Sequence, residues 1–231
     1  MRSVIKDRLE LIWQRIRQAA ERCGRNPQEI KLVAVSKTHP AAKIKEAITA
    51  GQLIFGENRV QEAEPKINEI GKAAEWHLIG HLQSNKARRA VRLFDVIESV
   101  DSLELASRLD RICKEESKQG LQIFLEVNVG NEKQKSGVSI NEAEEIAKEL
   151  ARFSNLRFSG LMTIPPFFED VEKVRPFFKR LRELRDHLSK QNLFYGRGEL
   201  SMGMSSDFEI AIEEGATLVR IGTAIFGERQ R

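Results

Sequence analysis

Eight short apolar segments alternate with longer segments of helical pattern along this 231-residue chain. The strand-like segments lie at residues 32–37, 53–55, 77–79, 96–98, 121–128, 156–162, 199–201 and 218–221. The helical segments lie at residues 3–22, 40–50, 59–70, 85–93, 103–118, 139–152, 171–190 and 206–214. Strands that alternate with helices form parallel sheets, and eight repeats at this length favour a closed (β/α)8 barrel over an open doubly wound sheet. We therefore predict an α/β fold, a TIM barrel, with a single domain over residues 1–231.

The first helical segment precedes the first strand and is amphipathic. Its apolar stripe consists of Val4, Ile5, Leu9, Leu11, Ile12 and Ile16, among charged side chains. The chain has little room for a helix after the last strand. We expect this extra N-terminal helix to fill that gap in the outer ring of helices, so deletion of residues 1–22 should unfold the protein.

The composition excludes several classes of function. The 38 basic and 34 acidic side chains are interleaved, and the net charge of +4 does not indicate a nucleic-acid partner. The amino end has no apolar stretch long enough for a signal peptide or a membrane span, so we expect a cytoplasmic protein with no membrane partner. Cys23 and Cys113 are far apart and lack further ligands at metal-binding spacing, which indicates structural thiols.

Lys37 ends the first strand-like segment. A period of two places Val33, Val35 and Lys37 on one face, so an ammonium group lies in line with core residues. Burial of an ammonium group is costly and lowers its pKa, which makes a lysine nucleophilic toward carbonyl groups. Two interpretations stay open: a lysine whose head reaches solvent, and a Schiff-base lysine at the mouth of a barrel.

The segments after strands seven and eight have the composition of an anion site. They contain two glycines and three hydroxyl side chains: Gly203, Gly222, Ser205, Ser206 and Thr223. Loops at this position of a barrel often hold phosphate, and glycine lets the backbone approach it closely. Ser206 and Glu209 form a capping-box pair for the next helix, whose free amides would face the anion. The alternative is that the serine only caps the helix.

Arg220 lies in the last strand, and its orientation has two solutions. Either the face with Leu218 and Arg220 points into the barrel, or the face with Val219 and Ile221 does. An inward arginine stays charged and must be paired. A salt bridge to Glu126 or another inward acid and a contact to a ligand are both open.

Three polar residues are associated with the second and third predicted strands. Asn58 follows the second strand, His77 lies in the third, and His81 follows the third. Asn58 precedes Gln61 by three residues and would be a helix cap first and a ligand contact second. His77 and His81 are four residues apart but lack an obvious third ligand, so we predict no metal site. His81, which follows a glycine at the end of its strand, is the better candidate for a site residue.

With these residues assembled, the sequence resembles the pyridoxal-phosphate homeostasis protein family. The motifs are Ala-Val-Ser-Lys-Thr at 34–38, Phe-Gly-Glu-Asn-Arg at 55–59, Trp-His-Leu-Ile-Gly-His-Leu-Gln-Ser-Asn-Lys at 76–86, Leu-Ser-Met-Gly-Met-Ser at 200–205, Val-Arg-Ile-Gly-Thr at 219–223 and Phe-Gly at 226–227. They span nearly the whole chain in order, which makes the resemblance specific.

The resemblance implies a single barrel like the amino-terminal domain of alanine racemase, with pyridoxal 5′-phosphate (PLP) as its cofactor. It implies that Lys37 forms the Schiff base, that Ser205, Gly222 and Thr223 bind the phosphate, that Arg220 faces the pyridine nitrogen, and that Asn58 and His81 flank the cofactor. Family members are regarded as carriers or regulators of the cofactor and of amino-acid and keto-acid balance, without an established catalytic activity. We therefore expect a PLP-binding regulatory protein without catalytic residues, with amino acids and apo-enzymes as partners.

An arginine facing the pyridine nitrogen offers a physical account of such inactivity. A permanently charged guanidinium disfavours a proton on that nitrogen, which makes the ring a weak electron sink. Tyr195 precedes strand seven, so we expect it at the opposite end of the barrel, where it cannot act as a second base. Because the sequence shows no second domain of the racemase type, we expect a monomer. A slow amino-acid racemase that uses Lys37 with His81 or water, and a Schiff-base aldolase for a sugar phosphate, remain alternatives.

Overall fold

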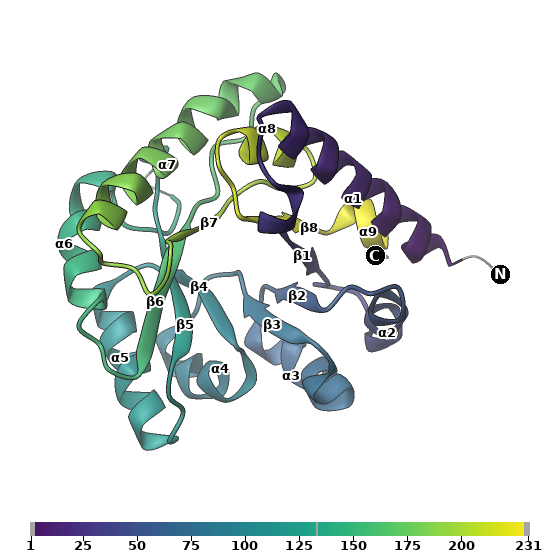
Figure 1. Ribbon diagram of the computed structural model, residues 1–231. Helices are drawn as coiled ribbons and strands as arrows, with labels where there is room; N and C mark the ends of the chain where they lie inside the picture. Colours follow the sequence, from purple (N-terminus) through teal and green to yellow (C-terminus); the bar gives the residue numbers. More distant parts are fainter. Residues whose placement is uncertain (1–2, 133, 229–231) are drawn as a thin grey trace.

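In the computed structural model, which describes residues 3–132 and 134–228, the strands form a closed parallel barrel (Figure 1). The strands are β1 (Lys31–Val35), β2 (Ile54–Glu57), β3 (Glu75–Leu78), β4 (Val96–Val100), β5 (Leu121–Glu126), β6 (Leu156–Met162), β7 (Glu199–Ser201) and β8 (Leu218–Ile221). They follow chain order around the barrel, and β1 pairs with β8 to close it, with Leu32 opposite Val219. The predicted (β/α)8 barrel is confirmed.

Helices surround the barrel (Figure 1). They are α1 (Val4–Arg22), α2 (Ala41–Thr49), α3 (Val60–Ile70), α4 (Ala87–Leu93), α5 (Leu103–Glu115), α6 (Ile140–Leu150), α7 (Arg175–Lys190), α8 (Phe208–Glu213) and the single turn α9 (Thr223–Phe226). Short 3-10 turns lie at Pro27–Glu29, Gly71–Ala73, Ser84–Lys86 and Val171–Val174. The capping box of Ser139 and Glu142 opens α6 as the sequence predicts. Among these helices none is long and apolar enough to cross a membrane.

Successive residues of the strands face two different cores. One small cluster brings together Val33, Val96, Phe124, Met162 and Leu218 from five strands, and it lies in the barrel interior. The larger cluster includes Leu32 and Val219 and lies between the strands and the surrounding helices. This alternation places Leu218 and therefore Arg220 on the inward face of β8.

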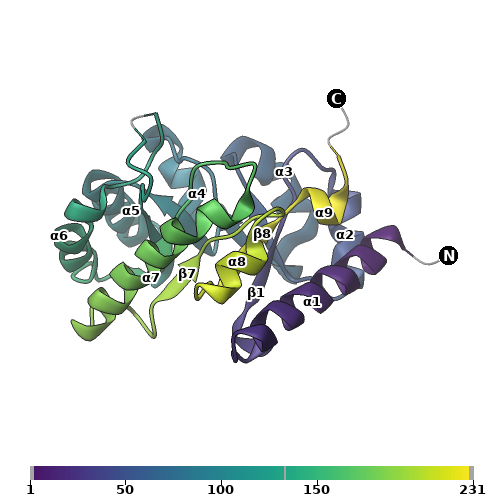
Figure 2. The same cartoon turned by 90° about the horizontal axis from the view of Figure 1, so that it is seen from above.

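The N-terminal helix α1 closes the outer ring, as predicted. It packs against α8, α9 and α2, and both views show it beside α9 (Figures 1 and 2). Its buried face consists of Ile5, Leu9, Ile12, Ile16, Ala19 and Ala20. Arg15 donates to Glu209 at 2.7 Å, and Arg22 donates to Glu213, which links the polar edge of α1 to α8. Since α9 is one turn long, α1 supplies the long helix that the ring lacks after β8.

The first strand ends two residues earlier than the sequence suggests. Ser36 still donates its backbone N–H to Gly56 at 3.0 Å, but His39 then bonds back to the carbonyl of Ser36 and closes a turn. Thr38 has a φ of 66°, which ends any extended conformation. The prediction that the strand reaches Lys37 is therefore wrong, and Lys37 lies in the turn after β1.

Candidate functional site

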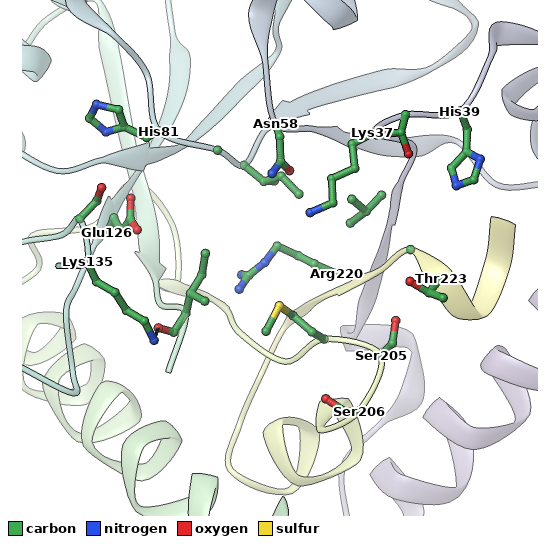
Figure 3. Close-up of a pocket in the computed structure, with 18 of the residues that line it drawn as sticks. Lys37, His39, Asn58, His81, Glu126, Lys135, Ser205, Ser206, Arg220 and Thr223 are labelled. Carbon is green, nitrogen blue, oxygen red and sulfur yellow. Dashed lines mark hydrogen bonds between the residues drawn. The ribbon is translucent and has the colours of Figure 1, made fainter. Parts of the chain in front are cut away.

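A cavity of about 570 Å³ opens where the strands end (Figure 3). The seven residues predicted from the sequence all line it: Lys37, Asn58, His81, Ser205, Arg220, Gly222 and Thr223. They come from the carboxyl ends of β1, β2, β3, β7 and β8 or from the loops that follow. The barrel therefore brings together residues up to 186 positions apart along the chain, from Lys37 to Thr223.

Lys37 extends into the cavity from a firmly held turn (Figure 3). On one side, the Ser36 hydroxyl donates to the buried Glu57 at 2.6 Å, and the Lys66 ammonium donates to the Ser36 carbonyl at 3.0 Å. On the other side, the backbone N–H of Thr38 donates to the Glu62 carboxylate. With its neighbours fixed, the Lys37 side chain is held in the cavity.

One end of the cavity offers donors suited to a phosphate group. Figure 3 shows Ser205 and Thr223 on the side of the cavity away from His81. Gly222 precedes α9, whose first amides, at Thr223 and Ala224, have no intrahelical acceptor. Hydroxyl groups and amides at a helix start are the donors that phosphate sites use. The residues present therefore fit the phosphate of PLP.

The predicted capping box at Ser206 is wrong. The helix α8 starts at Phe208, and the Asp207 carboxylate turns back to accept the backbone N–H of Met204 at 2.6 Å. The backbone N–H of Phe208 also donates to the carbonyl of Met204, so the start of α8 offers fewer free amides than expected. Gly203 permits this tight turn, because its φ is 92° and a Cβ there would lie 2.6 Å from the Cβ of Ala211. Ser206 does not occupy the cap position of α8, and it lines the cavity.

Arg220 points inward from β8, and its side chain lines the cavity on the side of the barrel interior. Its Nη2 donates to the Thr163 carbonyl at 2.8 Å, and its Nη1 donates to the Ser201 hydroxyl at 2.5 Å. The acidic partner is Glu98 at 3.9 Å, whereas Glu126 acts on it only at longer range. The ion pair with an inward acid is therefore present, and Arg220 also lines the cavity, while its contact to a ligand stays a prediction.

Asn58 and His81 reach the cavity by different means. The expectation that Asn58 caps α3 is wrong, because Arg59 occupies the cap position and α3 starts at Val60. Asn58 is the residue between β2 and that cap, and its side chain faces the cavity (Figure 3). His81 lies at the exposed rim, where its Nδ1 is 3.0 Å from Asp101.

Several lining residues were not singled out from the sequence. They include His39, Lys135, Ser136, Ile164 and Met204, all in loops. Glu126, considered only as a partner of Arg220, also faces the cavity. Its burial and the nearby charge of Asp101 raise its pKa to about 7. Loop residues such as Lys135 carry no periodic signal, so their approach to a site appears only in the folded chain.

His77 lies in the barrel interior between two carboxylates. It is buried, and its Nδ1–H donates to Glu98 at 2.5 Å while its Nε2–H donates to Glu75 at 2.9 Å. Burial alone would lower the pKa of His77, but these hydrogen bonds raise it to about 9. Burial alone would raise the pKa of Glu98, but the bond from His77 and the charges of His77 and Arg220 hold it below its usual value. Within residues 3–132 and 134–228 no cluster of three metal-ligating side chains occurs.

The stability of the protein should fall as the pH rises from 6.5 to 9. Since the folded pKa of His77 lies above its unfolded value of about 6.5, its contribution is complete below pH 6.5 and disappears above pH 9. The loss is at most about 3–4 kcal/mol, because the pKa rises by about 2.5 units and each unit corresponds to about 1.4 kcal/mol. Urea unfolding of the parent and of His77→Gln across this range measures it. The control His187→Gln, at an exposed position on α7, should keep the fall seen in the parent. An equal fall in the parent and in His77→Gln would assign the effect to other groups.

The comparisons with known proteins agree with this geometry. The family model described as alanine racemase, N-terminal domain, matches residues 8–230. The chain is 44% identical to the pyridoxal phosphate homeostasis protein of Aquifex aeolicus over 227 residues, which cover 97% of this chain and 98% of that protein. It is 42% identical to the protein of the same name from Escherichia coli K12, with 97% of each covered.

Solved structures give the same result. The structure of PipY from Synechococcus elongatus with PLP bound is 40% identical, has a TM-score of 0.82, and is matched over 96% of this chain and 100% of that one. An alanine racemase from Clostridium difficile is 16% identical with a TM-score of 0.70, and is matched over 97% of this chain and 57% of that one. That second likeness concerns the fold alone.

The fold and the site define a barrel of the alanine racemase N-terminal type with an inward lysine at its mouth. Within that class, the chain belongs to the pyridoxal phosphate homeostasis protein family.

Proposed function

We propose that this protein binds PLP as a Schiff base on Lys37 and acts as a carrier and buffer of the cofactor. In this role it takes part in the intracellular balance of PLP, amino acids and keto acids. The observation that carries the proposal is the composition of one cavity: the Lys37 amine shares it with a hydroxyl-rich and amide-rich end and with the buried cation Arg220. The names of the relatives and the PLP-bound PipY structure support it.

Each part of the cofactor has a matching group in the cavity. Ser205, Gly222 and Thr223 would hold the phosphate, and Arg220 would face the pyridine nitrogen. Asn58 and His81 would flank the ring. When bound, PLP supplies an aldehyde that forms a carbon–nitrogen double bond with an amine and releases water, so binding on Lys37 is reversible and shields the aldehyde.

A regulatory role fits the residues better than catalysis does. Arg220, paired with Glu98, stays cationic and disfavours a proton on the pyridine nitrogen, which weakens the ring as an electron sink. Tyr195 lies at the opposite end of the barrel, as predicted, beside Lys31 and Glu75 at the amino ends of β1 and β3. A slow racemase would have to use His81 or water on the second face. Exchange of the α-hydrogen of alanine in deuterated solvent, above the rate with free PLP, is the result that would favour it.

We also propose that the barrel works as a single domain, as a monomer in the cytoplasm, and passes PLP to apo-enzymes or amines. The cavity supports direct exchange because His81 at its rim is exposed, so an incoming amine can reach the ligand without unfolding the barrel. Sedimentation of the purified protein with and without PLP would establish whether one copy suffices.

Borohydride reduction after incubation with PLP tests the proposal. Peptide mass mapping should find a pyridoxyl group on Lys37, and Lys37→Ala should lose both the label and the absorbance of the Schiff base. Lys45→Ala is the matched control, because Lys45 is an exposed lysine on α2 that pairs with Glu69 at 2.8 Å. An unlabelled Lys37 in the parent protein with excess PLP would overturn the proposal.

A further inference from the structure

A line of buried polar side chains crosses the barrel below the cavity. The Arg220 Nη1 donates to the Ser201 hydroxyl at 2.5 Å, and that hydroxyl donates in turn to Oε2 of Glu98. The other oxygen of Glu98 accepts the Nδ1–H of His77 at 2.5 Å, and His77 donates its second N–H to Glu75. The line starts at the cavity and ends at the partly exposed Glu75, so it spans the interior from one end to the other.

The hydrogen bonds along this line have one consistent set of directions. The guanidinium of Arg220 can only donate, so the Ser201 hydroxyl accepts from it through a lone pair and keeps its single proton for another acceptor. A charged Glu98 is such an acceptor, and protonated His77 keeps Glu98 charged although it is completely buried. From Ser201 to Glu75, each donor therefore meets an acceptor, which is the condition under which a buried polar network fixes one geometry.

The same contacts fix the plane of the Arg220 guanidinium. Ser201 on β7 holds Nη1, and the carbonyl of Thr163, just after β6, holds Nη2 at 2.8 Å. Since the guanidinium is rigid and planar, two fixed nitrogen atoms determine the directions of its remaining N–H groups. The Glu98 carboxylate lies 3.9 Å from Arg220, so the intervening hydroxyl orients the group more directly than the ion pair does.

We propose that Ser201 and Glu98, held by His77, are positioning residues that direct Arg220 at the ring nitrogen of PLP. The proposal rests on the proposed function, because it assumes that PLP occupies the cavity. The consequence is specificity. With Arg220 held in this direction, the protein binds a ring whose nitrogen accepts a hydrogen bond more tightly than a ring with a C–H at the same position.

The test compares two ligands, PLP and its deaza analogue, in which a C–H replaces the ring nitrogen. Ser201→Ala should bind PLP about tenfold more weakly than the parent, because the hydrogen bond to a charged group is no longer directed. Its affinity for the deaza analogue should stay within about twofold of the parent value. Ser159→Ala is the matched control, since Ser159 is a buried serine on β6 whose hydroxyl bonds to Gln122 and the Arg157 carbonyl and not to Arg220 or Glu98.

The outcomes separate this proposal from the proposed function. Equal weakening of both ligands in Ser201→Ala, or no weakening of either, would overturn the positioning role. Failure of the parent to form a pyridoxyl group on Lys37 would instead overturn the proposed function. Should Ser201→Ala not fold, Glu98→Asp carries the same comparison, because it keeps the charge but withdraws the carboxylate from Ser201. If Glu98→Asp does not lose more affinity for PLP than for the deaza analogue, the proposal fails.

Discussion

Deletion of residues 1–22 should leave a chain that does not fold cooperatively. The deletion removes α1, whose buried face includes Ile5, Leu9, Ile12 and Ile16. Full burial of an aliphatic side chain contributes roughly 2 kcal/mol, so these four alone contribute about 8 kcal/mol. That amount is comparable to the whole stability of a typical domain, about 5–15 kcal/mol. The deletion also uncovers the faces of α8, α9 and α2 against which α1 packs.

Far-UV circular dichroism and urea unfolding of the truncated chain measure this effect. Two single substitutions within α1 provide the matched pair. Ile16→Ala, at a completely buried position, should cost about 2–5 kcal/mol, whereas Leu11→Ala, at a position that is 57% exposed, should cost less than about 1 kcal/mol. A truncated chain that melts like the parent would show that the ring of helices does not need α1.

The repeating pattern of this fold can be predicted from the sequence, because each strand and helix has a local pattern of apolar residues. Strand β6 and helix α1 have the expected extents, since β-branched and apolar runs or a helical apolar stripe define them. The misplaced boundaries lie at turns. At Lys37 and at Asp207, side-chain hydrogen bonds to the backbone decide where an element ends or begins. Glu62, which accepts from Thr38, is 24 positions away along the chain, so its approach appears only in the folded protein.

The site divides in the same way. Residues at strand ends, such as Lys37 and Arg220, were found because all strand ends of a barrel meet at one edge. The partner of Arg220 was not fixed by the sequence, which offered Glu126 along with any other inward acid. Glu98 lies closer because of the relative heights of β4 and β8 in the barrel, and those heights depend on strand register around the whole closed sheet. No local pattern contains that information.

Replacement of Arg220 by methionine should destabilise the protein by about 3 kcal/mol. The substitution keeps an apolar stem in the barrel but leaves the completely buried Glu98 with His77 as its remaining cationic partner. Removal of one member of a buried ion pair is costly because the other charge has lost its compensation. Urea unfolding at pH 7 measures the change in the free energy of unfolding.

The double variant Arg220→Met with Glu98→Gln distinguishes charge from packing. If the cost arises from an uncompensated carboxylate, neutralising Glu98 should restore part of the stability, so the double variant should be more stable than Arg220→Met alone. If the cost arises from lost packing, the two substitutions should add. An additive result would mean that Arg220 and Glu98 do not act as a unit, and then Glu98 could not hold the guanidinium in place through Ser201 either.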